Sequence, residues 1–233
     1  MNRERKRIRI FGDSILKGVV YDEREDRYIP LEPDSFEQLG SQIGIEFQTT
    51  TRFGCTVTKG MKLLQRAVTA GLQCDGVLLE YGGNDCDFCW EEVAAHPDIM
   101  HLSKTPIQEF EQTLKRMVMY IKSAQSIPML MTLPPIDAER YLNHICRNGL
   151  NRDNILHWLG DLHTIERYQE LYSLRIARVA LETHTQLIDV RSGFLSRRDC
   201  SSLICTDGIH PNAAGHALIM DLLADFHRSR ISA

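Results

Sequence analysis

Short apolar runs rich in β-branched residues alternate along the chain with longer stretches in which apolar residues recur every three or four positions. The short runs are typical of buried strands, and the longer stretches are typical of amphipathic helices. The sequence predicts five strands, over residues 8–11, 45–51, 76–79, 127–133 and 185–190. Strands that alternate with helices in this way predict an α/β fold with a mostly parallel sheet and helices on both faces.

Three of the intervening stretches carry an apolar stripe at helical spacing, over residues 107–121, 168–179 and 214–226. Such stripes are the faces with which helices pack against a sheet. Pro211 is expected to be the first residue of the last helix, because proline is favoured at that position. Residues 1–233 are therefore expected to form a single domain, a three-layer α/β/α sandwich with a five-stranded, flavodoxin-like sheet.

Glycines and polar residues gather after four of the five predicted strands. The carboxyl ends of parallel strands lie at one edge of a sheet, and ligands of such folds bind outside that edge. We therefore expect the four clusters to lie close together and to form a site. They read GDS at 12–14, RFGCT at 52–56, YGGND at 81–85 and CTDGIHPN at 205–212.

Three residues of these clusters predict nucleophilic catalysis. A serine hydroxyl such as that of Ser14 is a poor nucleophile unless a neighbouring base accepts its proton. His210 is a suitable base, because histidine titrates near neutral pH. Asp207 precedes it by three residues, close enough for its carboxylate to hold the Nδ1–H and leave Nε2 facing Ser14. These residue types in this arrangement predict a catalytic triad.

The same clusters offer hydrogen-bond donors for an oxyanion. Acyl transfer needs N–H groups directed at the oxygen on which negative charge develops. The backbone N–H of Ser14 is one candidate. Gly54 is a second, because a residue without Cβ allows close approach to its backbone. The side-chain amide of Asn84 is a third, with Gly82 and Gly83 leaving room around it.

The four clusters, in this order and over nearly the whole chain, resemble the sequence blocks of the SGNH hydrolases, also called GDSL esterases and lipases. The matching residues are Gly12-Asp13-Ser14, Gly54, Gly82-Gly83-Asn84-Asp85 and Asp207-Gly208-Ile209-His210. The resemblance implies a three-layer α/β/α sandwich that hydrolyses esters. It also implies Ser14 as nucleophile, Asp207 and His210 as the rest of the triad, and Gly54 and Asn84 as oxyanion donors.

Two details qualify this resemblance. The block of Gly54 is nearly one residue long, so Gly44 and Gly60 are alternatives to it, and Ile15 replaces the leucine that usually follows the serine. The chain contains no Gly-x-Ser-x-Gly elbow, which argues against the ordinary α/β-hydrolase family.

Each candidate also has an ordinary structural explanation. Ser14 could cap a helix or a turn, Asp207 could cap a turn, and Asn84 could occupy a left-handed turn. His210 and His216 could suggest a metal pair, but metal ligands on one helix face are usually three or four residues apart. With all four blocks present, we favour the catalytic interpretation and expect no metal.

Two acidic residues at the third cluster, one inside it and one directly before it, call for separate explanations. Asp85 is expected to be structural and to accept hydrogen bonds from loop amides. Glu80 lies at the end of the third strand, where a charge is expensive to bury unless it is paired. We consider two alternatives for Glu80, a contact with a basic partner near the site and exposure at the strand end.

Two segments could shape a substrate pocket. Residues 21–28 are a mixed-charge run for which a solvated loop is the favoured interpretation. Residues 134–161 are long for a connection in such a fold, and long connections are often lids or binding segments or carry an extra helix. We hypothesise that residues 134–161 form a lid over Ser14.

Composition limits the classes of binding partner and the cellular compartment that we expect for this protein. The net charge of −4 gives no electrostatic reason to expect nucleic acid, and no segment approaches the about 20 apolar residues of a membrane helix. Seven scattered cysteines fit reduced thiols in a cytoplasmic protein. Cys86 and Cys89 have redox or half-zinc spacing, but no second pair accompanies them, so we expect plain thiols.

The sequence thus predicts a cytoplasmic serine esterase that acts on a small-molecule ester without metal or cofactor. A small acyl group on a carbohydrate is favoured, because the loops lack a long apolar stripe to line an acyl chain. A lysophospholipase or acyl thioesterase is the enzymatic alternative. A non-catalytic binding module, and a redox or zinc protein built on Cys86 and Cys89, are alternatives of other classes.

Overall fold

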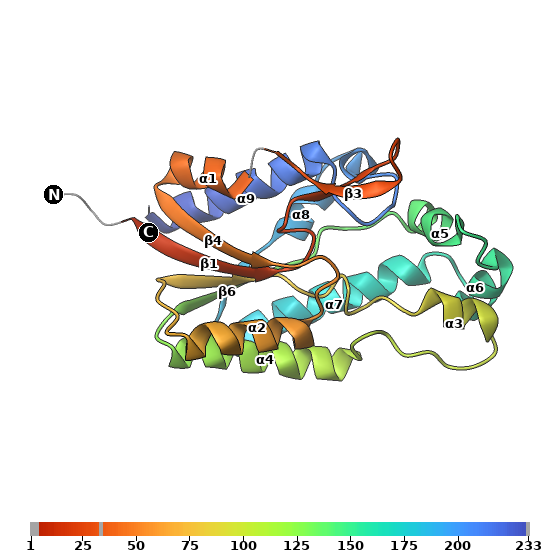
Figure 1. The fold of residues 1–233 in the computed structure, drawn as a ribbon, viewed down its shortest axis with the longest axis horizontal. Coiled ribbons are helices and arrows are strands. Elements are labelled where there is room, and N and C mark those ends of the chain that lie inside the picture. The colour runs from red at the N-terminus through yellow and green to blue at the C-terminus, as the bar shows by residue number, and fades with distance from the viewer. Residues whose placement is uncertain (1–4, 33–34, 232–233) are drawn as a thin grey trace.

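The computed structural model describes residues 5–32 and 35–231, in which a five-stranded sheet lies between two layers of helices (Figure 1). All five strands are parallel, in the order β4-β1-β5-β6-β7. This is the flavodoxin-like order, so the predicted fold class is confirmed. The strands are β1 (Lys6–Gly12), β4 (Ile45–Thr51), β5 (Gly76–Leu79), β6 (Ile127–Met131) and β7 (Gln186–Ile188).

The two helical layers bury opposite faces of the sheet, because successive residues of a strand point to opposite sides. Phe11 of β1 packs against one layer and Ile10 against the other. The layer against Phe11 consists of α2 (Val57–Thr69), α4 (Ile107–Ser123) and α7 (Thr164–Glu182). The layer against Ile10 consists of α1 (Ser35–Ile43), α8 (Val190–Leu195) and α9 (Ala213–Ile231). The three predicted apolar stripes lie on α4, α7 and α9.

The remaining elements lie beyond the carboxyl ends of the strands, on the right in Figure 1. A third apolar cluster joins three of these helices around Trp90 and Ile155. Residues 134–161 therefore carry two helices of their own. The elements are the hairpin of β2 (Val19–Asp22) and β3 (Arg27–Pro30), α3 (Trp90–Ala95), α5 (Ala138–Cys146), α6 (Arg152–Leu159) and a 3₁₀ turn, η1 (Cys200–Leu203).

The last helix begins later than the proline rule predicts. Pro211 lies outside α9, and the side-chain oxygen of Asn212 accepts the backbone N–H groups of Ala214 (3.0 Å) and Gly215 (3.1 Å). Asparagine is among the strongest N-caps, which explains why Asn212 rather than Pro211 sets the start. His210 consequently lies in the loop before the cap. No helix in the described part of the chain combines the length and apolarity needed to cross a membrane.

Candidate active site

Ser14 lies in a tight turn directly after β1. The carbonyl of Ser14 accepts the N–H of Val19 (3.0 Å), and the carbonyl of Asp13 accepts that of Lys17 (3.1 Å). The Asp13 side chain closes the turn by accepting the N–H of Ile15 (2.8 Å). These bonds hold the serine hydroxyl at the carboxyl edge of the sheet, where the strand-end argument expects it.

Ser14, His210 and Asp207 form one hydrogen-bonded line. Ser14 Oγ lies 2.9 Å from His210 Nε2, and His210 Nδ1 lies 2.5 Å from Asp207 Oδ2. All three residues are buried. With Nδ1–H donating to Asp207, Nε2 carries the lone pair that accepts the serine proton. The tertiary structure thus brings together three residues that the sequence only suggested should meet.

Asp207 is held as an ionised acceptor. Its Oδ1 accepts the backbone N–H groups of Ile209 and His210, each at 3.2 Å. Burial by itself raises the pKa of Asp207, but the hydrogen bonds from the His210 side chain and from these backbone groups outweigh burial and lower the pKa below its usual value. A carboxylate at this position can orient the imidazole and stabilise its protonated form during a reaction.

Two aromatic residues that the sequence analysis did not single out surround His210. The Phe53 ring is stacked on the imidazole, with centroids 5.9 Å apart and planes at 12°, and the Tyr28 ring lies 4.9 Å away. Tyr28 belongs to the run expected to be a solvated loop. That expectation is right for the exposed residues 23–26, but the flanks pair as β2 and β3 and bring Tyr28 to the site. The β-branched and aromatic residues on both sides of the charged turn, Val19-Val20-Tyr21 and Tyr28-Ile29, were the available signal.

The hairpin also meets α5 across the mouth of the site. The Tyr28 hydroxyl lies 3.0 Å from His144 Nε2, and the Tyr21 ring packs edge-on against the same imidazole at 4.9 Å. Residues 134–161 therefore contribute directly to the surroundings of Ser14. Their function as a lid remains a prediction.

Gly54 lies in the loop between β4 and α2 with φ of +65°, a conformation that favours glycine. Its two alternatives lie elsewhere. Gly44 connects α1 to β4 at the opposite edge of the sheet, and Gly60 is inside α2, where a Cβ would come within 2.3 Å of the Tyr81 ring. Among these three glycines, only Gly54 lies in a loop at the carboxyl edge of the sheet.

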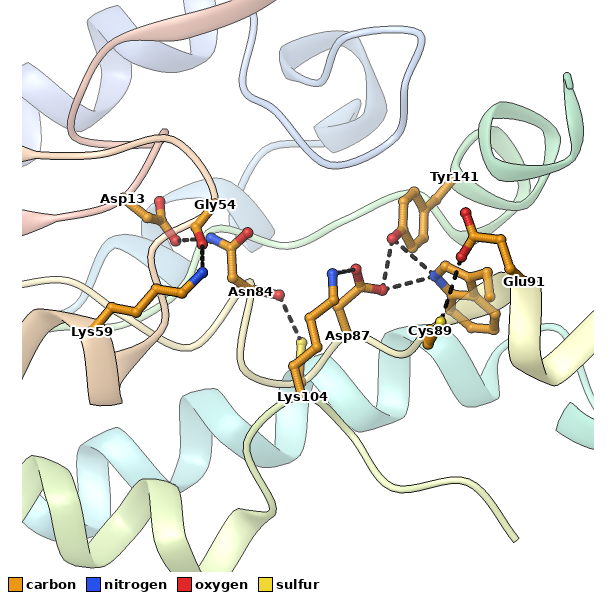
Figure 2. Close-up of polar contacts among 12 residues, drawn as sticks. Asp13, Gly54, Lys59, Asn84, Asp87, Cys89, Glu91, Lys104 and Tyr141 are labelled. Atoms are coloured by element: carbon orange, nitrogen blue, oxygen red, sulfur yellow. Dashed lines mark hydrogen bonds and ion pairs between the residues drawn. The ribbon is translucent and has the colours of Figure 1, made fainter. Parts of the chain in front are cut away.

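The Asn84 amide is directed by Asp13. Asn84 Nδ2 donates to Asp13 Oδ2 at 2.7 Å, as Figure 2 shows. A side-chain amide carries two N–H groups, so one is occupied by Asp13 and the other is left for a ligand. Asn84 lines the same cleft as Ser14 and His210.

Asp85 and Glu80 differ in how well the sequence anticipated them. Both carboxyl oxygens of Asp85 accept the backbone N–H of Val57, at 2.9 and 3.1 Å, so Asp85 does bind a backbone amide as expected, but this amide begins α2 rather than lying in a loop. Burial raises the pKa of Asp85 to about 7.

Neither alternative for Glu80 is correct. Its side chain is fully buried rather than exposed, and it lies beside Asp13 rather than beside a basic side chain.

A cleft of about 270 Å³ begins at Ser14 and is lined largely by apolar and aromatic side chains. The loops were expected to offer no apolar surface for an acyl chain, and this expectation is wrong for the folded chain. The lining comes from separate segments, so no single stretch of sequence carries it. Its apolar and aromatic members include Tyr28, Phe53, Phe88, Trp90, Leu133, Ile136, Tyr141, Ile165, Tyr168 and Ile209.

Asp87 organises one wall of this cleft. Its Oδ1 accepts the Tyr141 hydroxyl at 2.7 Å and the Trp90 indole N–H at 2.8 Å, and its Oδ2 pairs with Lys104 Nζ at 2.7 Å (Figure 2). Burial raises the pKa of Tyr141 well above its usual range, so Tyr141 remains a donor. The network fixes two aromatic side chains that line the cleft.

The cysteines and His216 have partners other than a metal. Cys86 Sγ lies 3.2 Å from the Gly83 carbonyl, and Cys89 Sγ lies 3.6 Å from Glu91 Oε2. His216 Nε2 lies 3.0 Å from the Val19 carbonyl, and burial lowers its pKa to about 4. Residues 5–32 and 35–231 contain no group of three or more His, Cys, Asp or Glu side chains that could hold a metal ion.

A comparison with protein-family models assigns most of the chain. The model of the GDSL-like Lipase/Acylhydrolase family matches residues 10–218. This range includes all the residues proposed for the site, from Ser14 to His210. No curated protein matches the chain in sequence.

Solved structures share the fold over nearly its full length. A lipase/acylhydrolase from Enterococcus faecalis has a TM-score of 0.69 at 18% identity, covering 97% of this chain and 96% of that one. The psychrotrophic esterase EstA from Pseudoalteromonas sp. has a TM-score of 0.61 at 17% identity, covering 98% and 100%. A catalytic mutant of Axe2, an acetylxylan esterase from Geobacillus stearothermophilus, has a TM-score of 0.64 at 18% identity, covering 95% and 94%.

Proposed function

We propose that this chain, which belongs to the GDSL-like lipase/acylhydrolase family and is an ester-bond hydrolase, acts through a triad of Ser14, His210 and Asp207. The observation that carries the proposal is the pair of contacts at His210, 2.9 Å to Ser14 Oγ and 2.5 Å to Asp207 Oδ2. The base therefore lies within hydrogen-bond reach of both the nucleophile and the orienting carboxylate.

The reaction then follows from the geometry. His210 Nε2 takes the Ser14 proton while Oγ attacks the ester carbonyl, and a tetrahedral intermediate forms. His210 returns that proton to the leaving alcohol as the C–O bond breaks, which leaves the acyl group on Ser14. A water molecule then loses a proton to His210 and attacks the acyl-enzyme, and Ser14 departs with the proton as the acid is released.

Three donors are proposed to hold the oxyanion of the intermediate: the backbone N–H groups of Ser14 and Gly54, and the free N–H of Asn84. The Asn84 bond to Asp13 at 2.7 Å fixes the amide before the reaction, so little reorganisation is needed as charge develops. Replacing Asn84 by alanine is expected to lower kcat by about 10² to 10³, the usual effect of removing one such donor.

Labelling with a serine-directed fluorophosphonate tests the nucleophile. The native protein should react and S14A should not, while S41A, which changes an exposed serine on α1, should react like the native protein. A native protein that fails to react would favour the non-catalytic binding module. Retention of the label in S14A would show that another serine is the nucleophile.

We propose a small acyl group on a carbohydrate as the substrate class. The cleft of about 270 Å³ lies below the roughly 300–1,000 Å³ of typical small-molecule sites, which favours a short acyl group. One structural neighbour is an acetylxylan esterase. The apolar lining favours a second candidate, a lysophospholipase or thioesterase with a longer acyl chain.

An acyl-length series separates the two substrate classes. Values of kcat/KM for p-nitrophenyl esters from acetate to octanoate should fall as the chain lengthens, and acetylated xylo-oligosaccharides should release acetate. If kcat/KM instead rises with chain length, and lysophospholipids or acyl-CoAs are cleaved while acetylated sugars are not, the second candidate replaces the first.

A further inference from the structure

Two carboxyl groups are buried side by side beneath the Ser14 turn. Glu80 follows β5 and is 0% exposed, and Asp13 follows β1 and is 1% exposed. The Asp13 backbone N–H donates to Glu80 Oε2 at 3.2 Å. A Cβ added to Gly12 would lie 3.0 Å from the same oxygen, so the Glu80 carboxyl packs directly against the end of β1. Burying two ionised carboxylates in contact would be very costly.

The hydrogen bonds distinguish the two acids. Both oxygens of Asp13 accept, Oδ1 from the Ile15 N–H at 2.8 Å and Oδ2 from Asn84 Nδ2 at 2.7 Å. These are the contacts of an ionised carboxylate. Glu80 Oε1 is buried and has no hydrogen-bond partner, so nothing at this atom stabilises a negative charge on Glu80.

The Glu80 and Asp13 carboxyl groups act on each other's pKa, and two adjacent buried carboxyl groups hold one proton between them. Burial, followed by the charge of Asp13, raises the pKa of Glu80 well above its usual range, and the bond to Asp13 raises it further. Burial also raises the pKa of Asp13, while its bonds to Ile15, Glu80 and Asn84 lower it. Glu80 is therefore the partner that keeps the proton.

We propose that Glu80 is a positioning residue, whose neutral carboxyl group donates to the Asp13 carboxylate and thereby holds Asn84 in place for catalysis. This inference rests on the proposed function, because it concerns the donor assigned to the oxyanion. Asp13 touches both the Ser14 turn and Asn84, so a proton on Glu80 stabilises two parts of the site at once.

Loss of that proton would disturb the site. Two adjacent negative charges would repel each other, displace Asp13 and release Asn84. No ion pair in the described part of the chain involves either acid, so no paired lysine or arginine would compensate. The other titratable side chains that interact electrostatically with the pair are Cys55, Tyr81, Asp85 and His210.

Substitution of Glu80 tests the need for a neutral donor. Glutamine presents an N–H in place of the acid O–H and cannot ionise, whereas methionine fills a similar volume without a donor. We expect E80Q to keep kcat within a few-fold of the native value. We expect E80M to lose about 10² in kcat with a smaller change in KM, comparable to the loss of an oxyanion donor. E46Q, at an exposed site on β4, is the matched control.

The pH dependence of activity shows whether Glu80 holds Asp13 and Asn84 in position or only fills space. Native activity should decrease on the alkaline side as Glu80 ionises, and this decrease should be absent from E80Q. Equal loss of activity in E80Q and E80M would mean that a charged Glu80 is required and would overturn the proposal. Equal and native-like activity in both variants would overturn it as well. Thermal unfolding of each variant identifies any loss caused by misfolding.

Infrared difference spectra make the test independent of catalysis. The native spectrum minus that of E80Q, recorded at neutral pH, should contain the C=O stretch of a protonated carboxyl group. A carboxylate signal in its place would refute the neutral acid even in a fully active enzyme. Conversely, a protonated signal in a protein that does not hydrolyse esters would contradict the proposed function and leave the acid pair intact.

Discussion

The Ser14 hydroxyl lies 2.9 Å from a histidine nitrogen that is 196 residues away in the chain. The residue types on both sides of that contact were recognisable in the sequence, because Gly-Asp-Ser and Asp-x-x-His are short motifs with local geometry. Phe53 and Tyr28 were not, because aromatic residues beside polar neighbours occur throughout most proteins. Their place against His210 depends on which loops meet at the sheet edge.

At the scale of single residues, hydrolysis should depend on His210 as the base. H210Q removes the imidazole that accepts the Ser14 proton, so kcat/KM for a short activated ester should fall by about 10² to 10⁴. S14A should show no hydrolysis and should keep the native far-UV spectrum and unfolding temperature. A native-like kcat/KM in H210Q would contradict the assignment of His210 as the base.

Elements were predicted more reliably than the contacts between them. The bounds of β4 and β5 agree with the predicted strands, because each is a compact apolar or β-branched run. The start of α9 was misplaced because two capping signals, Pro211 and Asn212, stand side by side and only one can prevail. The β2–β3 hairpin was missed because charged residues dominate its turn.

The contact between α5 and this hairpin provides a test of the lid hypothesis. H144A removes the hydrogen bond to Tyr28 and the ring contact with Tyr21. We expect the ratio of kcat/KM between acetate and longer acyl esters to shift several-fold, because the two walls are no longer joined. E139A, at an exposed site on the same helix, should keep the native ratio. Identical acyl preferences in H144A and native protein would argue against a lid.

Across the whole molecule, His216 connects the last helix to the segment that follows Ser14. It is buried, and its ring nitrogen lies 3.0 Å from the Val19 carbonyl. Burial lowers its pKa from 6.5 to about 4. The unfolded chain therefore binds the proton first as pH falls, and the stability contributed by the neutral form is lost between about pH 6.5 and pH 4.

The free energy of unfolding should accordingly decrease over this window by an amount on the order of 3 kcal/mol from His216. H216Q keeps an N–H for Val19 and cannot gain the charge, so its stability should change less over the same window. H157Q replaces an exposed histidine and should follow the native curve. Urea unfolding at several pH values measures all three, and parallel curves for native and H216Q would refute the prediction.

The sequence by itself determined the fold class and the residue types of the site, and the structure established the strand order. The apolar runs and stripes are periodic, and the motifs are contiguous, so both are visible in one dimension. Only the tertiary structure decided what surrounds those motifs: the aromatic rings on His210, the apolar lining of the cleft, and the carboxyl of Glu80 against Asp13. These features arise where segments distant in sequence meet, and burial there determines which groups are charged.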